Sequence, residues 1–184
     1  MKIESDRRTS YLIGEKVFKG RVNQHQTLIK KEPEEIYHIL IDPEQIKQWS
    51  PFEQISVERI TTGEFRVGTK FHFRLLSRIQ LGWNSEVIHL EMNRQIVSQF
   101  SNGIFKGGIE IWDLKKKESG TEVTHTFVYK INRWIYKIGW YVLGGEKKHD
   151  ELTELALFRL KLLLEKSAPL PPSLKTNHGQ NCDG

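Results

Sequence analysis

Two neighbouring segments decide the fold: GTEVTHTFVYK at residues 120–130 and ELTELALFRLKLLLEK at residues 151–166. The first alternates with period two, which is typical of a β-strand with one buried face. Its apolar face carries Val123, His125, Phe127 and Tyr129. The second has the spacing of an amphipathic helix. Its apolar stripe consists of Leu152, Leu155, Ala156, Leu160 and Leu163. Because an apolar sheet face must be covered, we expect this long C-terminal helix to pack across a sheet.

The sheet is expected to begin well upstream of residue 120. From Phe52 to about Asn132 the period is again two, and glycine-containing turn signals divide the segment, which predicts an antiparallel meander. We expect further inward faces at Phe71, Phe73 and Leu75, at Ile96, Ser98 and Phe100, and at Phe105, Ile109 and Ile111. A curved sheet covered by a single helix tends to leave an apolar cavity between the two.

Two short helices are predicted after the first strand, which we expect within residues 20–31. Pro33 follows Glu32 and precedes two acids, which favours a helix start. Asp42 before Pro43 predicts a second start, and Trp49-Ser50-Pro51 ends that helix.

The length of 184 residues fits one domain, which we expect over residues 18–166. Residues 1–17 are predicted to form a loosely ordered arm, and the Pro-rich residues 167–184 a disordered tail. The only cysteine is Cys182, and no secretory signal or membrane span is recognised. We therefore expect a cytoplasmic protein.

Charge and motifs exclude several classes of function. Lys and Arg number 28 against 23 Asp and Glu, and the signs alternate along the chain, so we expect no nucleic-acid partner. The histidines are dispersed, so no metal site is expected, and no cofactor is implied. None of the familiar catalytic motifs occurs.

Four motifs resemble the START/Bet v 1-like (SRPBCC) superfamily, and within it the polyketide cyclase/dehydrase and lipid-transport family. They are Pro33-Glu34-Glu35-Ile36-Tyr37, Asp42-Pro43-Glu44 to Trp49-Ser50-Pro51, Val67-Gly68-Thr69-Lys70-Phe71 and Gly120-Thr121-Glu122-Val123-Thr124. The resemblance implies an α+β helix-grip fold: a curved antiparallel sheet wrapped around a long C-terminal helix, with two short helices after the first strand. It does not fix an activity, because members of the family bind, carry or cyclise different molecules.

The predicted site is the face of the sheet that looks toward the long helix. The predicted ligand-binding residues are Phe71, Phe73, Leu75, Phe100, Ile109, Ile111, Val123, His125, Phe127, Tyr129, Trp140, Leu152 and Ala156. His125 is the candidate catalytic residue, because its ring could donate to a ligand carbonyl or act as a general base. The alternative is a core histidine whose ring is satisfied by the backbone or by a neighbour such as Tyr129. For His89, the alternation does not tell which face is inside.

Three functions stay open at this point. The first is a carrier or sensor that binds a small hydrophobic or amphipathic ligand, such as a lipid, isoprenoid, pigment or polyketide-like molecule. The second is a cyclase or dehydratase that uses acid and base residues of the cavity. The third is a protein-interaction domain whose cavity is filled by its own side chains. Residues 134–145 are aromatic and contain glycines, and they fit a lid, a peripheral membrane contact or core packing equally well. The sequence gives no oligomeric state.

Overall fold

The computed structural model describes residues 2–3, 9–51, 53–76, 81–131, 133–142 and 144–166. The strands are β1 (Lys2–Ile3), β2 (Thr9–Ile13), β3 (Lys16–Ile29), β4 (Ile55–Arg59), β5 (Lys70–Leu75), β6 (Gly82–Glu91), β7 (Gln95–Phe100), β8 (Ile109–Lys117) and β9 (Gly120–Tyr129). The helices are α1 (Pro33–Ile41), α2 (Pro43–Trp49), α3 (Trp134–Lys137), the π-helical turn η1 (Ile138–Val142) and α4 (Gly145–Lys166). The predicted tail over residues 167–184 lies outside the described residues.

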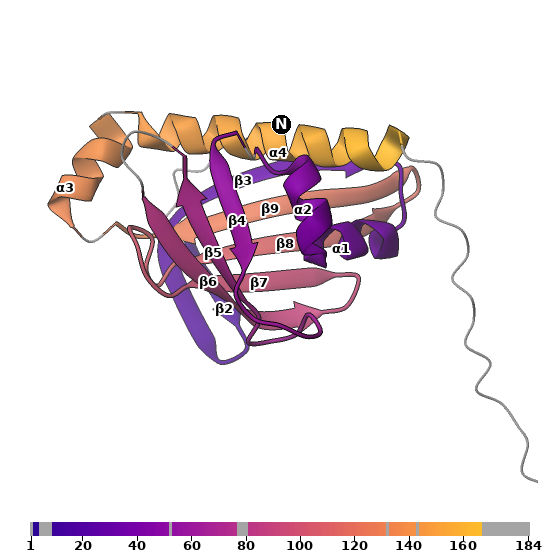
Figure 1. The fold of residues 1–184 in the computed structure, drawn as a ribbon, viewed down its shortest axis with the longest axis horizontal. Coiled ribbons are helices and arrows are strands. Elements are labelled where there is room, and N and C mark those ends of the chain that lie inside the picture. The colour runs from indigo at the N-terminus through magenta and orange to yellow at the C-terminus, as the bar shows by residue number, and fades with distance from the viewer. Residues whose placement is uncertain are drawn as a thin grey trace, which may run out of the picture.

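The strands form one antiparallel sheet in the order β1-β3-β9-β8-β7-β6-β5-β4, and β2 pairs with β3 off this path. Figure 1 shows α4 lying along the sheet, with α1 and α2 near one end and α3 beyond the other. The predicted helix-grip fold is therefore confirmed.

The two short helices begin where the sequence predicts. A capping box joins Glu32 and Glu35 at the start of α1. The Asp42 carboxylate accepts a 2.9 Å hydrogen bond from the Glu44 N–H at the start of α2. Pro33 and Pro43 occupy first helical positions, where the missing N–H costs nothing. Trp49 at the end of α2 contacts Trp112 of β8 edge-on, so α2 packs against the sheet.

The sheet has an apolar core on each side. On the inner face, which looks toward α4, Val87, Ile96 and Val123 pack with Ala156 and Leu160. The outer face, on the opposite side, has a second cluster formed by Phe18, Val22, Val97, Ile109, Ile111 and Val128.

The strand register corrects one sequence prediction. Trp112 stands opposite His125, whereas Ile111 stands opposite Thr126 and Ile109 opposite Val128. Because successive side chains of a strand alternate between faces, Ile109 and Ile111 lie on the outer face, away from His125. The prediction that these two isoleucines share the ligand-binding face was wrong.

The expected N-terminal arm is also corrected in part. Residues 9–13 form β2, which joins β3 through a two-residue turn whose Gly14 has φ of 56°. Tyr11 and Ile13 pack on the outer cluster, so this hairpin covers apolar surface that would otherwise face water. Gly20 lies so close to β9 that a Cβ would sit 2.4 Å from the Tyr129 carbonyl oxygen, which explains the glycine.

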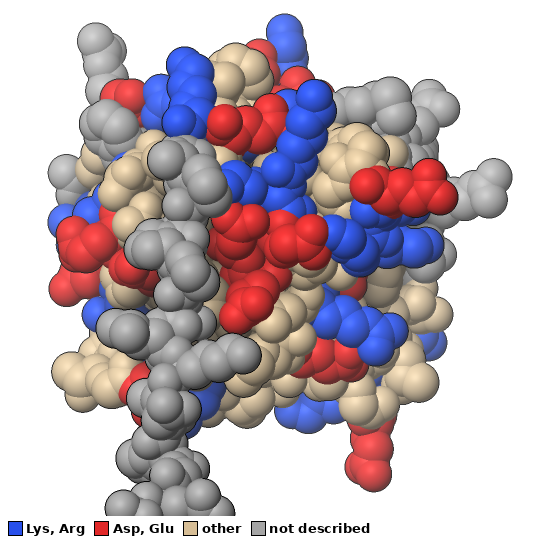
Figure 2. Space-filling view, turned by 90° about the vertical axis from the view of Figure 1, so that its right-hand side faces the viewer, with Lys and Arg blue, Asp and Glu red and all other residues tan. Residues whose placement is uncertain are grey.

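Oppositely charged side chains pair around the end of the molecule that holds α1 and the β8–β9 turn. Lys116 pairs with Glu32, Lys31 with Glu35, and Lys161 with Glu165. Figure 2 looks at the molecule from this side and shows acidic and basic residues interspersed. The described residues of this end therefore form no large surface of one sign.

Candidate functional site

Two histidines stand side by side on the inner face. His25 of β3 is directly opposite His125 of β9, and both are buried. His125 Nε2 donates a 2.7 Å hydrogen bond to Oε1 of Glu110, and its ring lies 4.6 Å from that of Trp112. Since the Nε2 proton is used in this bond, neutral His125 presents Nδ1 as a hydrogen-bond acceptor. In the pair of His125 and Glu110, the carboxylate orients the imidazole ring, and a histidine held in this way can act as a general base.

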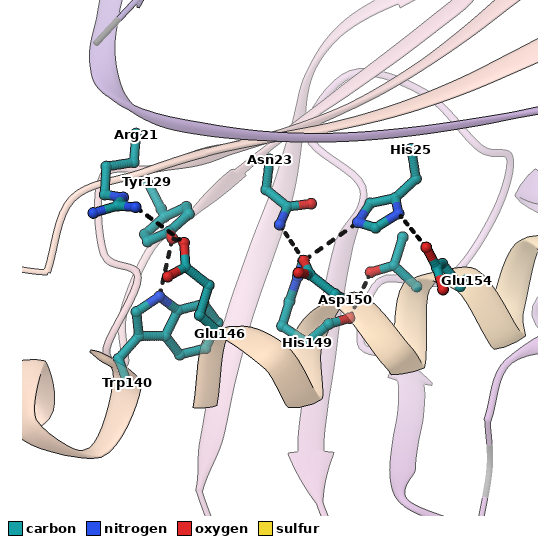
Figure 3. Close-up of polar contacts among 10 residues, drawn as sticks. Arg21, Asn23, His25, Tyr129, Trp140, Glu146, His149, Asp150 and Glu154 are labelled. Atoms are coloured by element: carbon teal, nitrogen blue, oxygen red, sulfur yellow. Dashed lines mark hydrogen bonds and ion pairs between the residues drawn. The ribbon is translucent and has the colours of Figure 1, made fainter. Parts of the chain in front are cut away.

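A ladder of polar contacts connects β3 to α4 (Figure 3). Arg21 Nη2 lies 3.4 Å from Glu146 Oε1, and the Asn23 amide donates to Asp150. His25 Nε2 lies 3.4 Å from Asp150 Oδ1, and His25 Nδ1 lies 3.7 Å from Glu154 Oε1.

The two elements match in spacing along this ladder. Two residues of a strand advance about 6.6 Å, and four residues of a helix advance about 6.0 Å, so alternate residues of β3 meet every fourth residue of α4. The ladder therefore fixes the position of α4 along the sheet.

Burial controls the protonation of His25. The pKa of His25 lies below its ordinary value, chiefly because the ring is buried and secondly because His125 is its neighbour. Asp150 and Glu154 act in the opposite direction without overcoming burial. The ring is therefore held neutral near pH 7.

A second polar chain joins the segment before α4 to the sheet. Trp140 Nε1 donates a 3.0 Å hydrogen bond to the hydroxyl of Tyr129, and this hydroxyl donates a 2.8 Å bond to Glu146. Burial raises the pKa of Tyr129 far above its usual range, so the hydroxyl stays protonated and remains a donor.

Aromatic rings fill the inner face next to this chain. Phe105 lies 4.9 Å from Phe127 and 4.8 Å from Trp140, both edge-on. Phe127 stacks on Tyr129 at 4.7 Å and on His149 at 4.6 Å. Trp140 is buried, so this part of the segment 134–145 is core packing. Such rings offer a flat apolar ligand both faces and edges to pack against.

Among the described residues, the buried polar atoms of the inner face of the sheet that lack a hydrogen-bond partner include Asn23 Oδ1, His25 Nδ1, Ser85 Oγ and His125 Nδ1. An unsatisfied buried polar atom lowers the stability of a protein by about 1–3 kcal/mol, and such atoms are rare in native structures. Each one therefore needs an explanation. Asn23 and His125 are on adjacent strands. Ser85 is three strands from β9, which is about 14 Å at the usual strand spacing of about 4.8 Å.

The structure brings most of the predicted ligand-binding residues to the inner side of the sheet. Phe71, Phe73 and Leu75 share one face of β5, and Phe71 lies opposite Ser85. Phe100 follows on β7. Val123, His125, Phe127 and Tyr129 share a face of β9, while Trp140, Leu152 and Ala156 are buried beside it. Of the predicted set, Ile109 and Ile111 belong to the outer cluster instead.

Several polar residues of this face are not predicted by the sequence pattern. Glu110 is not recognised because the sequence predicts that its neighbours Ile109 and Ile111 face inward. Asn23 and His25 alternate with glutamines and look like a solvent face in the sequence. The signal that could have revealed them is the spacing of Glu146, Asp150 and Glu154, which puts three acids on one face of α4.

Other features of the described residues add no site. An open surface hollow near Leu28, Lys116, Lys117, Glu118, Ser119 and Glu122 includes none of the predicted residues. Within the described ranges, no group of three His, Cys, Asp or Glu side chains could hold a metal ion. No described helix is long and apolar enough to cross a membrane.

Comparisons with known proteins agree with the fold. The family model of the Activator of Hsp90 ATPase homolog 1-like protein matches residues 30–155. TTHA0849 from Thermus thermophilus is 20% identical with a TM-score of 0.64, and the match covers 79% of this chain and 99% of that one. The Aha1 dimer from Colwellia psychrerythraea is 22% identical with a TM-score of 0.59, over 79% and 96% of the two chains. Protein CV1439 from Chromobacterium violaceum is 15% identical with a TM-score of 0.59, over 79% and 99%. No curated protein matches the sequence.

Proposed function

Since the chain belongs to the family of Activator of Hsp90 ATPase homolog 1-like proteins, which has the Bet v 1-like fold, we propose that it binds a small amphipathic molecule on the inner face of its sheet. The observation that carries the proposal is the set of buried polar atoms without partners at Asn23, Ser85 and His125, within a surface of aromatic rings. The molecule would be held between sheet and α4, and the protein would act as its carrier or sensor.

The chemistry of these atoms narrows the ligand class. Asn23 Oδ1 and His125 Nδ1 are acceptors, so they require a ligand that donates hydrogen bonds. Glu110 and Asp150 stand nearby, which disfavours an anionic group. A neutral ring system with hydroxyl groups, of the pigment or polyketide-like kind, fits better than a fatty acid. A cytoplasmic location stays a prediction.

The test compares two probes of nearly the same shape. A dihydroxynaphthalene with its hydroxyls at opposite ends can donate hydrogen bonds. The dimethylnaphthalene in which a methyl group replaces each hydroxyl cannot. Measured by calorimetric titration of the full chain, the dihydroxy probe should bind about fivefold to tenfold more tightly for each hydrogen bond formed.

Ser85→Ala separates binding from folding. It removes an unpartnered buried hydroxyl, so the variant should be at least as stable as the wild type and should bind the dihydroxy probe about fivefold more weakly. Ser56→Ala changes an exposed serine of β4 and should alter neither property. If neither probe binds, and native mass spectrometry of the freshly purified protein shows no adduct, the inner face is filled by its own rings. In that case the ligand-binding proposal is wrong and a protein-interaction domain is favoured. That role fits the activator named in the family's description.

The pair formed by Glu110 and His125 favours a cyclase as the second candidate function. His125 Nδ1 would take a proton from a carbon between two carbonyl groups of a polyketone. The enolate would attack another carbonyl carbon of the same molecule, and His125 would return the proton to the alkoxide. If a polyketone turns over, His125→Phe should slow it by about a hundredfold or more. Equal rates for the variant and the wild type would remove this candidate.

A further inference from the structure

Four apolar side chains of α3 and η1 face solvent at the end of the molecule opposite to α1. They are Trp134, Ile138, Tyr141 and Val142, here called the α3–η1 face, and Trp134 and Val142 are 71% and 73% exposed. Figure 1 shows α3 projecting past the end of the sheet. Exposed bulky side chains gathered in one short segment indicate a contact surface.

The π-helical turn η1 contributes side chains to both the core and the surface. Trp140 points inward and is held by its hydrogen bond to Tyr129 and by the Phe105 ring. The ring of the next residue, Tyr141, lies under the Arg21 guanidinium. The distance from the centre of this ring to Arg21 Cζ is 4.9 Å. The α3–η1 face is therefore fixed to the sheet through its neighbours and presented in a defined orientation.

The charged residues of the segment that carries this face have one sign, and the acid that follows the segment, Glu146, is paired with Arg21. Residues 130–145 contain Lys130, Arg133 and Lys137 and no acidic residue. All three side chains are exposed, and the Arg133 guanidinium lies over the Tyr136 ring at 5.6 Å. This differs from the interspersed charges at the other end of the molecule (Figure 2).

We propose that the α3–η1 face docks on an anionic lipid surface. Trp and Tyr rings gain free energy at a water–lipid boundary, where the ring is apolar and its tip stays wet, and nearby Lys and Arg are attracted to acidic headgroups. A second copy of the chain fits less well, because a two-fold contact would bring the same three cations against one another. The proposal does not depend on whether the inner face holds a ligand.

The test is co-sedimentation of the full chain with vesicles of phosphatidylcholine alone or mixed with phosphatidylglycerol. Binding is expected to the mixed vesicles and to weaken as salt is raised. The double variant Trp134→Ser with Val142→Ser should lower the partition coefficient at least about tenfold. Met92→Ser with Phe158→Ser removes other exposed apolar side chains, far from this segment in the sequence, and should bind like the wild type.

Circular dichroism and sedimentation velocity of the same samples complete the experiment. Both double variants should stay folded, because the replaced side chains face solvent. Binding to neither vesicle type, or equal loss in both double variants, would overturn the proposal. A wild-type dimer that the Trp134→Ser, Val142→Ser pair converts to a monomer, without vesicle binding, would show that a second copy covers the face instead.

Discussion

Trp134 and Trp140 belong to one short segment, and the structure predicts opposite consequences for their loss. Trp140 is buried, has ring neighbours at 4.8 Å in Phe105 and 5.3 Å in Tyr129, and donates a hydrogen bond. Trp140→Ala removes this packing, leaves a cavity and deprives the Tyr129 oxygen of its donor. The expected loss is about 3–5 kcal/mol of unfolding free energy. Trp134 is largely exposed, so Trp134→Ala should change stability by less than about 0.5 kcal/mol.

Urea titrations followed by circular dichroism give both free energies, and calorimetry gives the thermal midpoints. At about 2–4 °C for each kcal/mol in a chain of this size, Trp140→Ala should lower the midpoint by roughly 6–20 °C. Trp140→Phe keeps a ring in the site and should lose less than Trp140→Ala, which separates packing from the hydrogen bond. If Trp134→Ala and Trp140→Ala lower the free energy of unfolding by the same amount, the division of this segment into an inward and an outward part is incorrect.

Two further predictions concern His25 and the outer face. Burial lowers the pKa of His25, so the unfolded chain takes up the proton first as the pH falls; stability is present above about pH 6.5 and is lost below it. Between about pH 7 and about pH 5.5, the thermal midpoint should fall less steeply with pH in His25→Gln than in the wild type. His38→Gln changes an exposed histidine and serves as the control. Equal slopes in all three proteins would refute the role given to His25. Ile111→Val should lower the free energy of unfolding by about 0.5–1.5 kcal/mol. Because Ile111 belongs to the outer cluster, the affinity for the dihydroxynaphthalene probe should stay unchanged. Weaker binding in a calorimetric titration would contradict the placement of Ile111 on the outer face.

The architecture could be predicted because its local signals are strong. Pro33 and Pro43 open helices, the period of two continues through the meander, and the stripe from Leu152 to Leu160 requires a long helix. These signals depend on neighbours in the chain and need no knowledge of the tertiary contacts.

The faces of individual strands could not all be predicted, because both sides of this sheet are apolar. Ile109 and Ile111 look like inward residues in the sequence, yet the β2–β3 hairpin covers the opposite side and buries them there. His89 was ambiguous for a different reason: the register of β6 and β7 shifts between Val87 and His89, which breaks the alternation.

The polar half of the site depends on contacts between distant residues. Glu110 and His125 lie on adjacent strands, and Asn23 reaches Asp150 across the gap between β3 and α4. No local pattern encodes such pairs. The aromatic half was easier to predict, because Phe127, Tyr129 and Trp140 are bulky and follow recognisable spacing.

Methyl-labelled protein offers the most direct test of binding on the inner face. The full chain is titrated with the dihydroxynaphthalene probe while the Val, Ile and Leu methyl signals are followed by NMR. We predict that the signals of Val87, Ile96 and Val123 on the inner face shift, whereas those of Val97 and Ile111 on the outer face stay in place. Shifts confined to the outer face, or no shift at any methyl group up to saturation of the probe, would contradict it.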